Sequence, residues 1–220
     1  MISTFFDPSR GLWASPSRAH LPQTSLDMIE ALQRTRRPRK AIYMPTGGPT
    51  GTYLADILFI DEGLRKKNSN YSAILTLLQA NTRKAYARPL KTKTATETAV
   101  ALDSMIREAG DVQTIRTDSG KEFMNKKVRD VLATHNITHV PIDPDNHAPL
   151  SRLNRFHRTL RTLLERWFIS ARTDRWIDVL PELINNYNSQ VHTVTRMKPS
   201  YADEEKIRRM DISKAQQLSR

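Results

Sequence analysis

The sequence contains no cysteine, and this absence removes several kinds of chemistry. Without cysteine there is no disulfide, no thiol nucleophile and no zinc site that needs a cysteine ligand. No apolar run reaches the roughly 18 residues that a membrane-spanning helix needs. The first six residues lack the basic start and apolar stretch of a secretory signal. We therefore expect an intracellular protein that does not enter a membrane.

The sequence also has few acidic residues relative to basic ones, with 23 aspartates and glutamates against 35 lysines and arginines. The net charge of +12 favours a polyanionic partner, since each phosphate that is neutralised releases condensed counterions. A ribosomal-type or capsid protein could be basic for solubility or packing instead. The 220 residues, of which 38% are hydrophobic, suffice for one packed domain and an arm. We expect contact with nucleic acid.

The first part of the chain has little regular pattern. Residues 24–33 favour a short helix, and five cations follow between Arg34 and Lys40. Two of them, Arg36 and Arg37, are candidates for phosphate contact, although a solvated charged stretch would look the same. Three of the seven glycines lie in residues 44–51 and indicate a linker. The expected organisation is a basic arm and linker over 1–51, a core over 52–202 and a charged tail over 203–220.

Hydrophobic periodicity changes at the start of the expected core. Its pattern predicts strands at 53–61, 71–79, 84–90, 112–117 and 137–140. It predicts helices at 94–109, 121–135, 149–171 and 175–187. Three strands followed by alternating helices and strands indicate an α/β fold with a five-stranded mixed sheet flanked by helices.

Two aspartates, one inside a predicted strand and one at the end of another, are candidates for an active site. Asp56 interrupts the apolar strand Y-L-A-D-I-L-F, where a charge is unfavourable unless it is paired or bound to metal. Asp118 ends a later strand and could instead cap a helix. Two-metal phosphoryl transfer requires acids that converge on ions about 3.5–4 Å apart. Asp56 and Asp118 are therefore candidate metal ligands, although Asp56 could be salt-bridged.

Four short motifs follow one another in this region of the chain. They are P-L-K-T-K-T at 89–94, T-D-S-G-K-E-F at 117–123, N-R-F-H-R-T-L at 154–160, and Y-N-S, V-H and M-K-P-S between 187 and 200. Together they resemble a retroviral-type integrase catalytic core. They look closest to the integrases of Polinton/Maverick elements, large DNA viruses and retrotransposons. The resemblance implies an RNase H-like fold in which Asp56 and Asp118 bind Mg²⁺ or Mn²⁺ if the site is active.

The third catalytic position departs from the pattern of the family. Thirty-five residues separate Asp118 from Asn154, the spacing that the resemblance implies for a catalytic glutamate. An amide oxygen can touch a metal ion but brings no charge, so Asn154 predicts a degenerate site with at most one weakly bound ion. His157 could reach a metal, although a phosphate or backbone contact is the simpler expectation. Other acids that we do not expect to replace the glutamate are Asp61, Glu122, Asp145 and Glu165.

Basic residues surround this third position. The resemblance implies that the helix arginines Arg155, Arg158 and Arg161 contact DNA, and Lys121 beside Asp118 is a further candidate. A solvated basic face is the alternative. Integrases of the family usually add a His/Cys zinc module before the core and a small β-barrel after it. With no cysteine, and few residues after Pro199, we expect neither module here.

Three functional hypotheses remain open from the sequence. The chain is a catalytically inactive integrase-like domain reused for binding or assembly, for example in a virus particle. Alternatively, it is an active strand transferase that tolerates Asn154, or a non-enzymatic nucleic-acid-binding factor. The partners that we expect are DNA and a homo-oligomer or larger assembly, in the nucleus or a virion. Asn154 favours the inactive readings over the enzyme.

Overall fold

A computed structural model describes residues 6–7, 12–13, 48–142, 150–207 and 209–210. Near the N-terminus, β1 (Phe6–Asp7) pairs antiparallel with β2 (Leu12–Trp13). The predicted helix at 24–33 lies outside the described residues, as do Arg36 and Arg37. Among the described helices, none is both long enough and apolar enough to cross a membrane.

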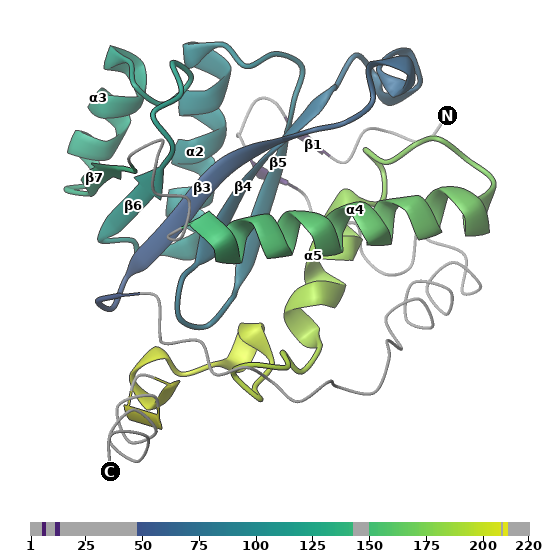
Figure 1. Ribbon diagram of the computed structural model, residues 1–220. Coiled ribbons are helices and arrows are strands. Elements are labelled where there is room, and N and C mark those ends of the chain that lie inside the picture. The colour runs from purple at the N-terminus through teal and green to yellow at the C-terminus, as the bar shows by residue number, and fades with distance from the viewer. Residues whose placement is uncertain (1–5, 8–11, 14–47, 143–149, 208, 211–220) are drawn as a thin grey trace.

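A five-stranded mixed sheet forms the centre of the domain (Figure 1). The strand order is β5-β4-β3-β6-β7, with β3, β4 and β5 antiparallel and with β6 and β7 parallel to β3. This arrangement confirms the predicted sheet. The strands are β3 (Thr52–Phe59), β4 (Ala73–Gln79), β5 (Ala85–Leu90), β6 (Thr114–Thr117) and β7 (Thr138–Pro141).

Helices cover both faces of this sheet. Alternate residues of a strand point to opposite faces, so Tyr53, Ala55 and Ile57 pack with α2 and α3. Leu54 and Leu58 pack with α4 and α5 on the other face. Figure 1 shows α4 crossing the sheet on the side opposite α2 and α3. The helices are α2 (Ala95–Ala109), α3 (Lys126–Thr134), α4 (Ser151–Ala171) and α5 (Leu180–Ser189).

Helix ends follow from local capping. The Thr94 hydroxyl accepts from the backbone N–H of Glu97, and Gly110 ends α2 at a φ of 79°. Helix α3 begins five residues later than predicted, because the Asn125 side chain caps it by accepting from the backbone N–H of Val128 (3.0 Å). The residues before Asn125 form a turn instead.

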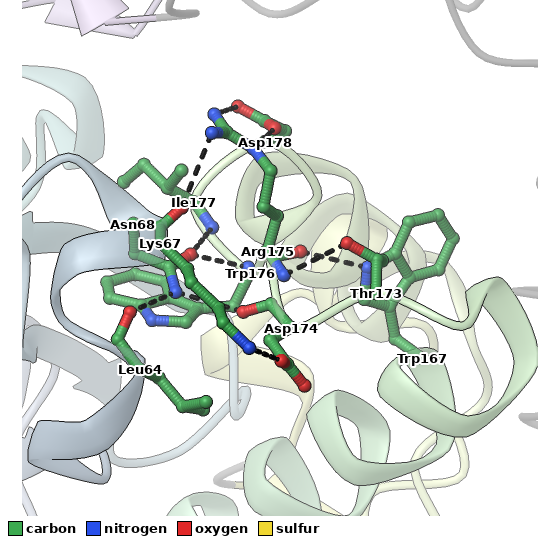
Figure 2. Close-up of polar contacts among 10 residues, drawn as sticks. All are labelled: Leu64, Lys67, Asn68, Trp167, Thr173, Asp174, Arg175, Trp176, Ile177 and Asp178. Carbon is green, nitrogen blue, oxygen red and sulfur yellow. Dashed lines mark hydrogen bonds and ion pairs between the residues drawn. The ribbon is translucent and has the colours of Figure 1, made fainter.

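One buried asparagine joins the β3–β4 connection to the loop between α4 and α5 (Figure 2). Asn68, whose exposed fraction is 0%, donates from Nδ2 to the carbonyl oxygens of Leu64 (2.8 Å) and Asp174 (2.9 Å). Its Oδ1 accepts from the backbone N–H groups of Trp176 (2.7 Å) and Ile177 (3.2 Å). Because these four bonds satisfy buried backbone groups, the loop that follows α4 is fixed to the sheet.

This junction also explains where α5 begins. The sequence predicts a helix from about residue 175, but α5 starts at Leu180. The backbone N–H groups of Trp176 and Ile177 are held by Asn68 in an extended and turn segment. Pro181 then occupies the first turn, where a missing N–H does no harm.

We predict that Asn68→Ala lowers the free energy of unfolding by about 2–4 kcal/mol, because it leaves several buried backbone groups unpaired. Urea unfolding followed by circular dichroism measures the change. The control is Asn185→Ala on the exposed side of α5, which should stay within about 0.5 kcal/mol of the parent. Equal stability of the two variants would show that the junction is not a structural anchor.

Candidate active site

The parallel register of β3 and β6 brings the two aspartates together. Leu54 pairs with Arg116, so two residues further along each chain Asp56 stands beside Asp118. Neighbouring strands lie about 4.8 Å apart. Since Leu54 faces α4, the alternation of side chains directs both carboxyl groups to the same face of the sheet. The two acids are therefore neighbours at this end of the strands, and the charge of Asp118 acts on Asp56.

The Asp56 carboxyl group is largely removed from water, with 25% of its side chain exposed. Burial, with smaller contributions from the negative charges of Asp118 and Glu122, raises the pKa of this carboxyl group to about 6. The N–H of Ile57, which donates to Asp56 Oδ1 (2.7 Å), acts in the opposite direction. Ionisation of Asp56 in this environment therefore lowers the free energy of unfolding of the metal-free protein.

Asp118 stands on a loop that is tied to the next strand. Its Oδ1 accepts from the backbone N–H of Gly120 (3.1 Å), and the Ser119 hydroxyl donates to the carbonyl oxygen of Ile142 (3.1 Å). Lys121 follows and is exposed. The loop thus holds a carboxylate and a cation at the end of β6.

Helix α4 contributes a histidine to this face. His157 is buried, and its Nε2 lies 2.7 Å from the Thr76 hydroxyl. Its Nδ1 lies 3.8 Å from Asp56 Oδ2. The ring therefore contacts the Thr76 and Asp56 side chains rather than the backbone. Thr76 was missed at the sequence level, although a lone threonine inside the apolar strand β4 was a usable signal.

Asn154 lies one turn before His157 and is exposed. Its side chain makes no hydrogen bond to another described residue. The exposed side of α4 also carries Arg155, Arg158 and Arg161, and the charge of Arg161 acts on His157. A glutamate at position 154 would consequently not be a buried unpaired charge, as it would be in a filled cleft.

The other acids considered from the sequence do not complete the site. Asp61 caps a short 3-10 helix by accepting from the backbone N–H of Gly63 (2.7 Å). Glu165 is exposed further along α4. Asp145 lies outside the described residues. In the described part of the chain, no three His, Asp or Glu side chains are arranged to hold a metal ion.

The segment after α4 braces the same helix from its other side. The Phe156 and Tyr187 rings meet edge to face, with centroids 4.9 Å apart. The Asn188 amide bonds both backbone groups of Ala85, at 2.9 and 2.8 Å. A pocket of about 240 Å³ remains between α4 and His192. Tyr187 and Asn188 of the Y-N-S motif thus have a packing role in this structure.

The raised pKa of Asp56 predicts a pH effect on stability. Between the unfolded pKa of 3.8 and the folded pKa of about 6, the folded protein binds more protons than the unfolded one, so stability falls as pH rises. Asp56→Asn removes this loss. In EDTA, we expect the variant to gain about 1–3 kcal/mol relative to the parent between pH 4 and pH 7. The free energies of unfolding come from urea unfolding curves. The same difference between the variant and the parent at pH 4 and at pH 7 would contradict the raised pKa of Asp56.

Known proteins share sequence and fold with this chain. Residues 48–147 match the integrase core domain family, a region that includes Asp56 and Asp118 and ends before Asn154. A putative uncharacterized transposon-derived protein of Caenorhabditis elegans is 29% identical over 136 residues, which is 61% of this chain and 47% of that protein. The retrovirus-related Pol polyprotein from transposon 412 of Drosophila melanogaster is 28% identical over 131 residues, or 58% of this chain and 10% of that protein. The chain thus spans less than half the length of these two relatives.

Solved structures share the fold at low sequence identity. A chain of the simian T-cell lymphotropic virus intasome, in complex with the PP2A regulatory subunit B56 gamma, has a TM-score of 0.63 and 17% identity, covering 78% of this chain and 61% of that one. The HTLV-2 integrase catalytic core domain in complex with magnesium has a TM-score of 0.57 and 16% identity, covering 69% and 95%. The BIV integrase catalytic core domain has a TM-score of 0.57 and 15% identity, covering 76% and 99%. The fold is therefore that of retroviral integrase core domains, and the family match over residues 48–147 supports a retroviral-type integrase catalytic core.

Proposed function

We propose that this chain is a DNA-binding integrase-type domain whose D,D,N site does not support strand transfer. The observation that carries the proposal is Asn154, an exposed amide on the first turns of α4, next to a site with two carboxylates. The domain would serve binding or assembly instead of catalysis.

The carboxylate charge that is absent at position 154 would contribute strongly to metal binding. One pair of unit charges about 4 Å apart contributes roughly 4 kcal/mol at an effective dielectric constant near 20. No acid on α4 replaces the glutamate, because Glu165 is the sole acid in this helix. It lies about 16 Å from Asn154 along the helix axis. Asp56 and Asp118 alone would therefore hold at most one hard divalent cation, and weakly.

Mg²⁺ or Mn²⁺, if bound, would supply the positive charge that draws nucleic-acid phosphates to the aspartates. The magnesium complex of the HTLV-2 core domain supports this choice of ion. Asp56 and Asp118 would hold it, since hard cations prefer carboxylate oxygens. Active strand transfer is the alternative function, and it is favoured by the retention of both aspartates side by side.

The exposed arginines of α4 would bind DNA. Arg155, Arg158 and Arg161 lie on the same helix as Asn154 and point to solvent. Lys121 is exposed at the adjacent end of β6. With these side chains on the phosphates, the binding would be independent of sequence and sensitive to salt.

The same surface suggests where the protein acts. A DNA-binding domain of this type would work in the nucleus or within a virion, as a homo-oligomer or as part of a larger viral or element assembly. The intasome in which a structural relative was solved supports the assembly role.

We predict that the double variant Arg158→Gln and Arg161→Gln binds duplex DNA more weakly. Fluorescence anisotropy at several salt concentrations should show the slope of log K against log salt reduced by about 2, one unit for each lost phosphate contact. The control replaces Lys126 and Arg129, exposed cations on α3 across the sheet, and should keep the slope. An affinity that does not change with salt would sink the proposal of phosphate binding.

A second prediction concerns the third position. Because Asn154 is exposed, Asn154→Glu should fold with a melting temperature close to that of the parent in EDTA. With Mg²⁺ it should gain thermal stability that the parent lacks, since the third carboxylate returns to the site. Asn154→Gln is the matched control, because it adds the length without the charge. Two tight Mg²⁺ sites in the parent, measured by calorimetry, would overturn the proposed degenerate site.

A further inference from the structure

The carboxylate of Glu204 joins the C-terminal part of the core to the end of the sheet at which β3 begins. Its Oε2 accepts hydrogen bonds from the backbone N–H of Gly51 (3.1 Å) and from Nε2 of Gln79 (3.0 Å). Its Oε1 accepts one from Nδ2 of Asn81 (2.6 Å). Gly51 directly precedes β3, whereas Gln79 ends β4. One side chain therefore holds three donors that come from two separate parts of the chain.

The two amide donors are buried, and the core orients them. Gln79 and Asn81 are 4% and 1% exposed, and each amide nitrogen has two hydrogens to donate. The second bond of Gln79 goes to Oδ2 of Asp111 (3.2 Å), and that of Asn81 goes to the carbonyl oxygen of Gly48 (3.2 Å). Because a buried donor that loses its acceptor is destabilising, both amides favour the conformation in which the Glu204 carboxylate is present.

Gly51, the backbone donor, is closely packed as well as hydrogen-bonded. It has a φ of 72°, and a Cβ at this position would lie 2.8 Å from the carbonyl oxygen of Asp111 and 2.7 Å from Cγ of Gln113. Its own carbonyl oxygen accepts from the backbone N–H groups of Gln113 (2.9 Å) and Thr114 (3.0 Å). The entry segment, residues 48–51, is thus bonded to the β6 side of the sheet and to Glu204.

Residues 199–207 come after α5 and form a strap at this end of the sheet, shown in yellow in Figure 1. Within the strap, the Asp203 carboxylate accepts from the backbone N–H of Lys206 (3.1 Å) and caps a helical turn over 204–207. Ile207 is buried, whereas Tyr201 is exposed. Among the described residues of the strap, Glu204 is the one whose side chain hydrogen-bonds to the sheet. The polar attachment of the strap therefore depends on this carboxylate.

We propose that the strap opens and closes without unfolding of the core, and that Glu204 couples this motion to the entry segment. An open strap leaves Gly51, Gln79 and Asn81 without their shared acceptor, so the entry segment is held less firmly. Since coupling between two sites is reciprocal, a partner that binds the open strap would also release the entry segment. A partner that holds the entry segment in place would keep the strap closed.

The strap is separate from the candidate active site. Gly51 precedes β3 and Asp118 follows β6, and these two strands are parallel, so Glu204 and Asp118 lie at opposite ends of the sheet. The coupling therefore does not depend on DNA binding or on the D,D,N site, and its tests need neither DNA nor metal.

The first test removes the charge of Glu204 and measures hydrogen exchange of the Gly51 amide by NMR in the full chain. Glu204→Gln keeps the side-chain length but turns one acceptor into a donor that faces other donors. We expect the Gly51 amide to exchange about tenfold faster or more, with unchanged exchange at the centre of β4. The matched control is Glu205→Gln, the same change at the exposed neighbour, which should leave Gly51 unchanged. Equal exchange at Gly51 in the two variants would contradict the proposal.

The second test works in the opposite direction, from the entry segment to the strap. Gly51→Ala places a Cβ against Asp111 and Gln113, and it should speed tryptic cleavage between Lys206 and Ile207, followed by mass spectrometry. Gly110→Ala is the matched control, because Gly110 has a similar φ of 79° and a Cβ there meets nothing within 4 Å. Cleavage that is no faster in Gly51→Ala than in Gly110→Ala would show that the two segments are not coupled.

A measurement on the parent protein covers the case in which a variant does not fold. In native-state hydrogen exchange at low urea concentrations, the Gly51 amide should open with little dependence on urea, as local opening does. The amides at the centre of β4 should show the steeper dependence of global unfolding. If Gly51 exchanges only with the dependence of β4, the strap does not open separately and the proposal is wrong.

Discussion

Helix α4 packs flat against the face of the sheet that carries the two aspartates, and this packing determines the environment of the site. His157 on α4 contacts Asp56 and bonds to Thr76, and the Asp56 side chain is half-buried. The burial raises the pKa of Asp56 and makes the site depend on a positive partner. The Asn68 junction holds the far end of α4, and through it the helix is fixed relative to β3.

Sequence and structure agree best where local rules are strong. The five strands and the helix over 95–109 were predictable, because apolar alternation and capping residues determine them. The start of α5 was not, since it depends on Asn68, a residue more than a hundred positions away. Asp56 and Asp118 could be placed side by side from motif order, yet the burial of Asp56 requires knowing that His157 packs on it. Likewise, the contact between Thr76 on β4 and His157 on α4 could not be predicted, because no local sequence pattern shows that these two elements pack together.

The replacement at position 154 has a limited structural effect and a large expected chemical effect. Asn154 is exposed and bonds to no described residue, so a family glutamate could be exchanged there without disturbing the core. The basic surface of α4 does not depend on that glutamate. The proposed loss of metal chemistry is therefore compatible with an unchanged fold and an unchanged basic surface on α4.

We propose that this domain binds DNA and that its D,D,N site does not catalyse strand transfer. A strand-transfer and nicking assay with oligonucleotide DNA, run in Mg²⁺ and in Mn²⁺, tests it most directly, with Asp56→Asn as the inactive reference. We expect the parent protein to give no more product than Asp56→Asn in either metal. Product formation by the parent that Asp56→Asn abolishes would contradict the claim and would establish an active enzyme.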